Sequence, residues 1–230
     1  MTQRLSGMRC VLASPASWSK RAAVGDRVTV EQAIQALGRP IFTTREIAAV
    51  RKGTLSATSQ VLSRMARQGL LVKAARGLWC NHADPRFSRF GLMPYLAGNH
   101  RAYVSLLSAL NLHGLIDQIP QVIYAVSTGS TRLVKTAVGT FSFHQIQPGF
   151  FAGFDWNGPN RTFLLATPEK AIVDSLYLST RKGNRFRYLP ELDVTNGPGR
   201  DAVEYWIGRI HDPLIRKSVR KKAIGLQLVD

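Results

Sequence analysis

Hydrophobic and polar positions between residues 29 and 68 follow a helical period and predict three short helices. The first starts after Thr29, a favourable N-cap, and carries apolar residues at i, i+3, i+4 and i+7, so that one side is buried. The second is expected to be capped by Thr43 or Thr44 and to run to about Val50. This spacing indicates a small helical unit with a single buried side on each helix.

The third helix is expected from Thr54 or Ser56 to about Gln68, and two β-like runs, residues 70–73 and 77–80, follow it. A glycine close to the point where the runs meet favours a hairpin. Short helices followed by a hairpin are the order in which a winged helix-turn-helix presents one helix to a DNA groove and its hairpin to the flanking backbone. We therefore predict such a unit here.

Later patterns mix strands and helices without regular alternation, which favours the α+β class. Strands are expected over 122–126, 141–146 and 162–166, and helices near 103–114, from 167, over 201–210 and after 213. The predicted organisation is a flexible basic arm (1–27), a winged helix-turn-helix (28–82), a linker (83–100) and a mixed α/β domain ending in a basic helix (101–230).

The strongly positive net charge indicates that the protein binds a polyanion. The chain has 230 residues, a net charge of +17 and 45% hydrophobic residues, enough for a packed core. Residues 1–90 hold 15 Lys and Arg against 4 Asp and Glu, residues 91–180 hold 5 against 4, and residues 181–230 hold 11 against 6. The basic charge therefore sits at both ends, where the two regions either form one polyanion-binding face or are ordinary solvated surfaces.

DNA recognition needs cations for phosphates and short polar side chains for base edges. On the third helix, Gln60 suits adenine and Arg64 suits guanine in the major groove. Lys73 and Arg76 are the expected hairpin contacts. The full set of predicted DNA-binding residues is Arg45, Arg51, Lys52, Thr58, Ser59, Gln60, Ser63, Arg64, Arg67, Lys73 and Arg76.

A second basic cluster follows Pro213 and comprises Arg216, Lys217, Arg220 and Lys221. Its spacing is helical, so it is a second DNA contact, a patch for an acidic partner, or a solvated helix face. The sequence gives no reason to choose among these.

No catalytic or metal-binding pattern stands out. The five histidines have no metal-site spacing, and Cys10 and Cys80 belong to no paired motif, so we expect no enzyme, metal or cofactor, and reduced thiols in a cytoplasmic protein. No run is apolar and long enough to span a membrane. A nuclease-like enzyme that uses Glu169 or Asp174 remains a less favoured alternative.

Three segments of the second half resemble the C-terminal domain of AbiEi-type antitoxins. They are residues 103–115 (YVSLLSALNLHGL), residues 123–126 (IYAV) with Arg132 after them, and residues 163–174 (FLLATPEKAIVD), which contain an Ala-Thr-Pro-Glu-Lys-Ala signature. The predicted N-terminal unit also resembles that family's usual DNA-binding domain. The resemblance spans about residues 28–180.

The resemblance implies a DNA-binding antitoxin and autorepressor of a bacterial type IV toxin–antitoxin operon. Such a protein binds double-stranded DNA at inverted repeats in its own promoter, here through Gln60, Arg64 and Arg76, and opposes a nucleotidyltransferase toxin. Residues 167–174 would then be structural core rather than a catalytic site. A stand-alone transcription regulator with a sensor domain would have the same sequence features and stays open as an alternative.

Overall fold

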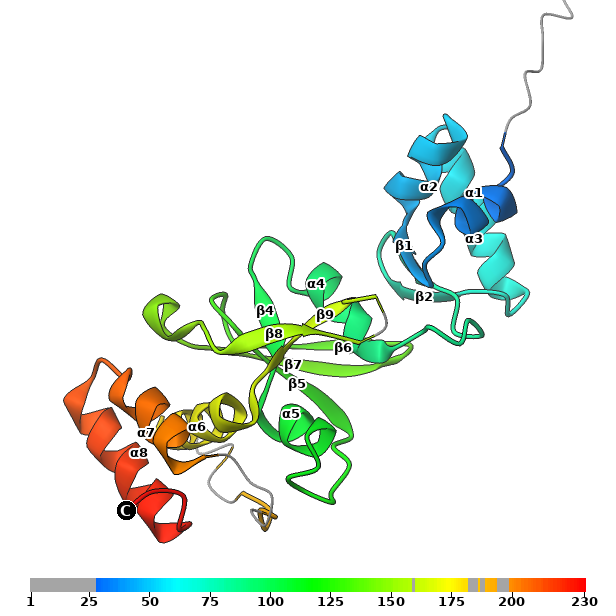
Figure 1. The fold of residues 1–230 in the computed structure, drawn as a ribbon. Coiled ribbons are helices and arrows are strands. Elements are labelled where there is room, and N and C mark those ends of the chain that lie inside the picture. The colour runs from blue at the N-terminus through cyan, green and yellow to red at the C-terminus, as the bar shows by residue number, and fades with distance from the viewer. Residues whose placement is uncertain (1–27, 159, 182–185, 187–188, 194–198) are drawn as a thin grey trace, which may run out of the picture.

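The structure is a computed structural model that describes residues 28–158, 160–181, 186, 189–193 and 199–230. The predicted basic arm, residues 1–27, lies outside the described residues. Helices and sheets are mixed along the chain, with a three-stranded and a six-stranded sheet (Figure 1). The predicted mixture of strands and helices is therefore confirmed.

The N-terminal part contains the three predicted helices and the predicted hairpin. Each helix begins where a threonine caps it: the hydroxyls of Thr29, Thr43 and Thr54 accept hydrogen bonds from first-turn backbone N–H groups. The helices are α1 (Val30–Leu37), α2 (Thr44–Arg51) and α3 (Leu55–Arg67), and the strands are β1 (Ile41–Thr43), β2 (Val72–Ala75) and β3 (Leu78–Cys80).

Strand β1 was not predicted. It pairs antiparallel with β3, from Ile41 opposite Cys80 to Thr43 opposite Leu78, and places β3 in the middle of the sheet. The sheet therefore ties the hairpin to the segment between α1 and α2. Phe42 of β1 is fully buried in the same cluster as the inner faces of the three helices, so this strand also contributes to the core.

Residues 83–100 were predicted as a linker, and this is wrong for their second half. A 3-10 turn, η1 (Arg89–Leu92), runs directly into the short helix α4 (Met93–Leu96). Leu92 and Met93 are at most 1% exposed and belong to the core of the larger part. Apolar residues at the end of this segment therefore fold onto the second sheet instead of spanning open solvent.

The larger part is built on a six-stranded mixed sheet with the order β6-β7-β5-β4-β9-β8. Pairs β4–β9 and β5–β7 are parallel, and the other neighbours are antiparallel. The predicted strands β5, β7 and β9 are confirmed, whereas β4, β6 and β8 were not predicted. The strands are β4 (Ala102–Val104), β5 (Val122–Ser127), β6 (Arg132–Thr136), β7 (Gly139–Gln145), β8 (Phe154–Asn157) and β9 (Phe163–Ala166).

The helices of the larger part follow the predicted order. Helices α5 and α6 pack against the sheet and each other, and α7 and α8 pack on α6 (Figure 1). They are α5 (Leu106–Leu112), α6 (Pro168–Ser179), α7 (Arg200–Gly208) and α8 (Pro213–Gly225), with a 3-10 turn η2 (Pro148–Phe150) before β8. Helix α6 is the central one, because nearly all of its residues are buried.

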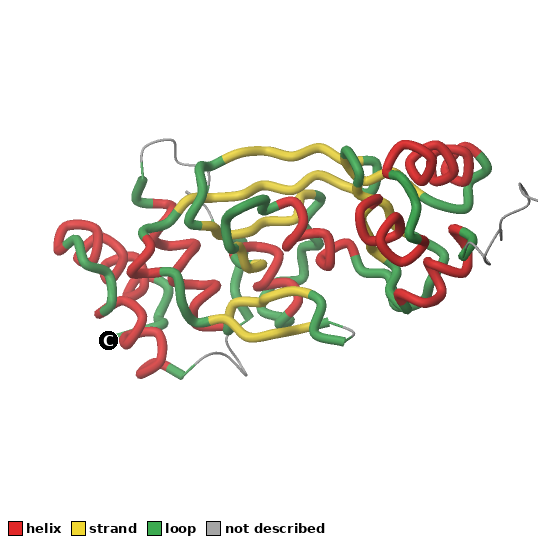
Figure 2. Tube along the Cα trace, turned by 90° about the horizontal axis from the view of Figure 1, so that it is seen from above, coloured by secondary structure: helices red, strands yellow, loops and turns green. Residues whose placement is uncertain are grey.

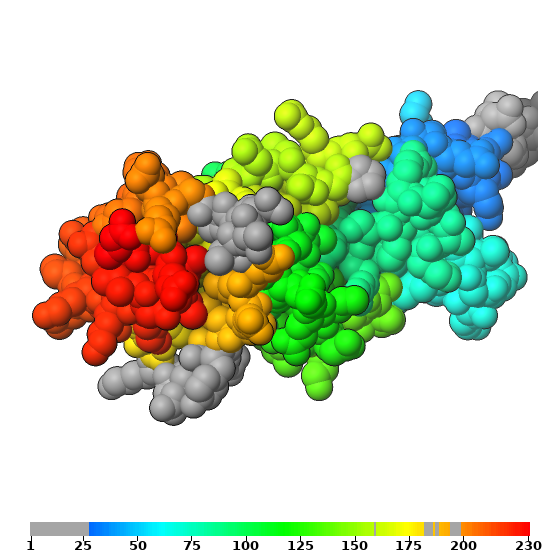
Figure 3. Space-filling view, turned by 60° about the horizontal axis from the view of Figure 1, so that its bottom comes forward, coloured from blue at the N-terminus to red at the C-terminus, as the bar shows by residue number. Residues whose placement is uncertain are grey.

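The molecule is elongated, with the N-terminal helices at one end and α7 and α8 at the other (Figure 2). The space-filling view shows the same order, with the green and yellow residues of the middle of the chain between the blue and red ends (Figure 3). Among the described residues, the basic positions of the N-terminal helices and those of α8 therefore lie at opposite ends and form no continuous face.

A buried polar cluster fixes α6 to the sheet. Lys170 and Asp174, one turn apart on α6, form an ion pair, and both are fully buried. The Asp174 carboxylate also accepts hydrogen bonds from the hydroxyls of Tyr103 at 2.9 Å and Ser105 at 2.8 Å. The Lys170 ammonium lies over the ring of Phe150, 3.8 Å from its centroid. The carboxylate and the ammonium are thus both compensated inside the core.

Burial should protect Cys80 from alkylation. Its side chain is fully buried, and burial raises the pKa of the thiol to about 11, so little reactive thiolate exists at neutral pH. In a Cys10→Ser variant, iodoacetamide should label Cys80 only after denaturant is added, as followed by mass spectrometry. Rapid labelling of the native protein would show that β3 is not enclosed as described.

Candidate nucleic-acid interface

The outer face of α3 is polar and open to solvent. Gln60, Arg64 and Arg67 are exposed, and Ser59 and Ser63 are half-buried beside them. These five predicted residues lie along one side of the helix, because the buried side is occupied by Leu62 and Met65 together with Thr58. The accessible side of α3 therefore offers two guanidinium groups, an amide and two hydroxyls to a ligand.

The prediction that Thr58 faces outward is wrong. Its side chain is fully buried, and its hydroxyl accepts a hydrogen bond from the Arg51 guanidinium at 3.2 Å. Arg51 also donates to the backbone oxygen of Val28 at 3.1 Å. The predicted phosphate contact of Arg51 is therefore replaced by an internal role: this side chain joins the starts of α1 and α3. Lys52, next to it, is exposed.

One exposed polar position of α3 was missed. Ser56 lies in the first turn of the helix and is exposed. In helix-turn-helix proteins, the N-terminal residues of the recognition helix contact base edges. The sequence predicted Ser56 only as an alternative N-cap. Because Thr54 is the N-cap, Ser56 falls inside the first turn of the helix.

The hairpin turn is held against the start of α2. The backbone N–H of Thr44 donates to the carbonyl of Gly77 at 2.9 Å, and the indole N–H of Trp79 donates to the Thr44 hydroxyl at 2.8 Å. Gly77 has a φ of 71°, which a residue with a side chain adopts only at a cost. These contacts fix the two-residue turn, Arg76 and Gly77, between β2 and β3.

Three exposed cations surround this turn. Arg76 is in the turn, Lys73 is on β2, and Arg45 is in the first turn of α2. The Lys73 ammonium lies 5.5 Å from the centroid of the Trp79 ring, which restricts this side chain to the surface of the hairpin. The structure thus brings the predicted hairpin residues together with Arg45.

The Thr44 hydroxyl should be a measurable part of this anchor. Thr44→Val leaves the buried indole N–H of Trp79 without a partner and should lower the free energy of unfolding by about 1–3 kcal/mol. Thr44→Ser keeps the acceptor and should cost less. Urea denaturation measures both variants, and equal losses for the two would show that the hydrogen bond is not what stabilises the turn.

One carboxylate lies close to the α3 face. The pKa of Glu31, in the first turn of α1, is lowered mainly by a hydrogen bond from its own backbone N–H and by one with Thr29. The positive charges of Arg51 and Arg64 lower it further. The start of α1 therefore adds a negative charge beside an otherwise basic surface.

The predicted C-terminal cluster is only partly free. Arg220 is paired with Glu204 of α7, and Arg216 donates to the backbone oxygen of Ile210 at 2.8 Å. Lys217 and Lys221 are exposed on α8. Two of the four cations thus stabilise the packing of α7 and α8, and this cluster lies at the opposite end of the molecule from α3 (Figure 1).

Asp174, one of the two acidic residues named for the nuclease alternative, has no open site. Asp174 is enclosed with Lys170, and the described residues contain no group of three or more His, Cys, Asp or Glu side chains that could hold a metal ion. Within the same residues, no helix has the length and apolar character needed to cross a membrane.

Comparison with known proteins identifies the segment that carries this surface. No curated protein matches the chain. Residues 28–82 match the family model described as "Transcriptional regulator, AbiEi antitoxin". The matched range begins just before α1 and ends after β3, and it contains all eleven predicted DNA-binding residues. Over residues 28–82 the chain is therefore similar to the AbiEi antitoxin family of transcriptional regulators.

Proposed function

We propose that residues 28–82 are a winged helix-turn-helix that binds double-stranded DNA. Helix α3 enters the major groove, and the turn between β2 and β3 lies on the adjacent phosphates. The element order α1, β1, α2, α3, β2, β3 supports this. The observation that carries the proposal is the exposed face of Gln60, Arg64 and Arg67 on α3 in a domain of a transcriptional-regulator family.

The contacts divide by chemistry. Gln60 and Arg64 can form paired hydrogen bonds with base edges, so we assign them to sequence recognition. Arg45, Lys73 and Arg76 surround the hairpin turn and are assigned to phosphates. The half-buried Ser59 and Ser63, with Lys52 in the turn before α3 and Arg67 at the end of α3, complete the proposed footprint. Thr58 and Arg51 are excluded from it because of their internal contacts.

The biological role we propose is repression of the protein's own operon through inverted repeats in its promoter, combined with antitoxin activity against a nucleotidyltransferase toxin. The family match supports an antitoxin-type regulator. The assignment of residues 101–230 as the antitoxin domain rests on the resemblance of residues 103–115 and 163–174, which form β4 with α5 and β9 with α6.

A co-expression experiment tests the antitoxin role. The open reading frame next to this gene is expressed from an inducible promoter with and without the full chain. Growth arrest that the chain relieves supports the proposal. Arrest that persists, with promoter binding intact, favours a stand-alone regulator instead. The Arg64→Ala variant should still relieve arrest from a separate promoter, because it affects only the DNA-binding surface.

A further inference from the structure

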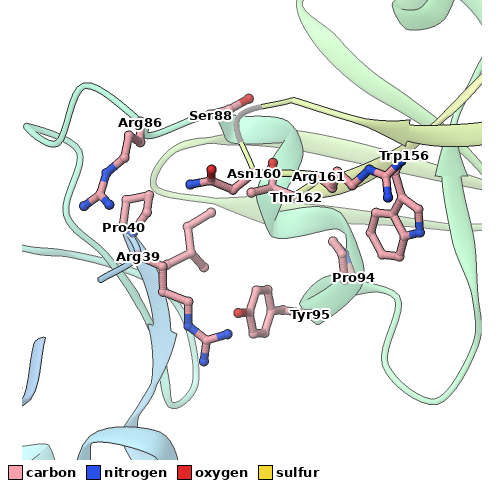
Figure 4. A pocket seen from close by; sticks show the side chains of 12 residues that line it. Arg39, Pro40, Arg86, Ser88, Pro94, Tyr95, Trp156, Asn160, Arg161 and Thr162 are labelled. Carbon is pink, nitrogen blue, oxygen red and sulfur yellow. The ribbon is translucent and has the colours of Figure 1, made fainter. Parts of the chain in front are cut away.

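A cavity of about 320 Å³ lies where the N-terminal part meets the six-stranded sheet (Figure 4). Three segments that are distant in the sequence form its walls: the end of the α1–β1 connection, the segment before and within α4, and the turn between β8 and β9. Cavities at such junctions are common places for small-molecule sites, and this volume is at the lower end of the usual range.

The cavity wall is basic. Arg39, Arg86 and Arg161 line it, and no Asp or Glu does. Arg39 is paired with Glu46, and Arg86 with Asp84, outside the lining. Arg161 forms no ion pair or side-chain hydrogen bond within the described residues. A guanidinium in this state is available to a carboxylate or phosphate group, which it binds with paired hydrogen bonds.

A buried hydroxyl in the wall lacks a partner. Oγ1 of Thr162 is inaccessible to solvent and is the one buried side-chain oxygen or nitrogen of the described residues without a hydrogen bond. Such an atom is unfavourable in a folded protein unless another group satisfies it. Thr162 follows Arg161 directly and lines the same cavity with its other side-chain atoms. A change of its χ1 rotamer would turn the hydroxyl into the cavity, where a polar ligand atom would satisfy it.

Two aromatic side chains complete the wall. The indole of Trp156 on β8 is 53% exposed, although large aromatic residues are normally buried. Tyr95 of α4 faces the cavity from the side of Arg39 (Figure 4). Burial raises the pKa of the Tyr95 phenol, which therefore remains a neutral hydrogen-bond donor. The wall thus combines planar rings with cations.

We propose that this cavity binds a small planar aromatic anion, whose carboxylate or phosphate is held by Arg161 and Arg39. Its ring packs on Trp156, and a polar atom of it forms the missing hydrogen bond of Thr162 once the threonine side chain has turned toward the cavity. This inference goes beyond the DNA-binding proposal and does not depend on it. Because residues 39–41 of the wall lead directly into β1, the ligand contacts the DNA-binding segment and the sheet together, as in a regulator that senses a metabolite.

The full chain is titrated by calorimetry at physiological ionic strength with four probes: AMP, salicylate, adenosine and inorganic phosphate. AMP carries a ring and a phosphate, and salicylate carries a ring and a carboxylate. At least one of these two should bind with a Kd below about 1 mM, and adenosine and inorganic phosphate should bind at least about tenfold more weakly. Comparison of AMP with salicylate identifies the anionic group.

Two variants locate the site. Arg161→Gln and Thr162→Val should each weaken binding of the better probe about tenfold, and Thr162→Val should leave the thermal midpoint unchanged or raised, because it removes an unsatisfied hydroxyl. The matched controls are Arg89→Gln and Arg64→Gln. Arg89 lies in η1, close in sequence to the lining residues Arg86 and Ser88 but outside the lining, and Arg64 lies on α3. Both variants should bind the probe like the wild type. Absence of binding by both aromatic anions, unchanged binding in both site variants, or equal losses in the controls would overturn the proposal.

Discussion

Lys170→Met is expected to lower the free energy of unfolding by about 3–5 kcal/mol, because removing one member of a buried ion pair leaves the other charge uncompensated. Asp174 would keep hydrogen bonds from Tyr103 and Ser105 but lose its counter-ion. Burial already lowers the pKa of Lys170, and the nearby Asp174 opposes this shift. The ammonium therefore depends on its partner as much as the carboxylate does.

The double variant Lys170→Met/Asp174→Asn is the matched control for charge. It removes both charges, while the amide oxygen introduced at position 174 would still accept from the two hydroxyls, so it should be more stable than Lys170→Met alone. Chemical denaturation of the full chain measures both, together with the Asp174→Asn single variant. If the Lys170→Met loss is below about 1 kcal/mol, or the double variant is the less stable one, the ion pair is not what fixes α6.

Replacing Gln60 or Arg64 by alanine should change which DNA sequence the protein prefers. Each true base contact is expected to contribute about 1–3 kcal/mol of discrimination. Arg76→Ala should instead weaken binding to all sequences about equally, because a phosphate contact carries no sequence information. Binding of each variant to a library of randomised duplexes, followed by sequencing of the bound fraction, distinguishes these effects. Equal losses on operator and random DNA for all three variants would contradict the assignment of α3 to base recognition.

The local pattern was sufficient for the N-terminal helices because each has its own start signal. Thr29, Thr43 and Thr54 cap α1, α2 and α3, and each was among the N-cap residues predicted for its helix. Strand β1 gave no such signal, because three residues are too few for a period and its pairing with β3 is a long-range contact. The linker prediction failed for the same reason, since only tertiary packing buries Leu92 and Met93.

Site residues were predicted less well than helices. Thr58, Leu62 and Met65 are spaced i, i+4 and i+7 and form the buried side of α3. The helical spacing of Thr58 therefore predicts its burial correctly, whereas its polar side chain suggests exposure. The internal bonds of Arg51 and the Arg220–Glu204 pair join residues from different elements. Basic character alone cannot distinguish such structural arginines from free ones.

The cavity of Figure 4 was beyond prediction altogether. Its wall joins Arg39, Tyr95 and Arg161, which no motif connects and which meet only because α4 and the β8–β9 turn pack beside β1. The buried Lys170–Asp174 pair, in contrast, had a signal in its i, i+4 spacing. That spacing makes the two residues neighbours on one side of a helix, but it does not by itself show that their charges form a pair inside the core.

The central claim is that DNA binds at the N-terminal end of the molecule, on α3 and the β2–β3 turn. Its most direct test compares two double variants that each remove two exposed cations, Arg64→Ala/Arg76→Ala and Lys217→Ala/Lys221→Ala. The probe is a fluorescent duplex from the region upstream of the protein's own gene, and anisotropy gives the Kd at several salt concentrations. The first variant should lose affinity and show a shallower dependence of log K on log salt, because it neutralises fewer phosphates. The second should bind like the wild type at every salt concentration. Wild-type binding by Arg64→Ala/Arg76→Ala, or an equal loss in Lys217→Ala/Lys221→Ala, would contradict the account.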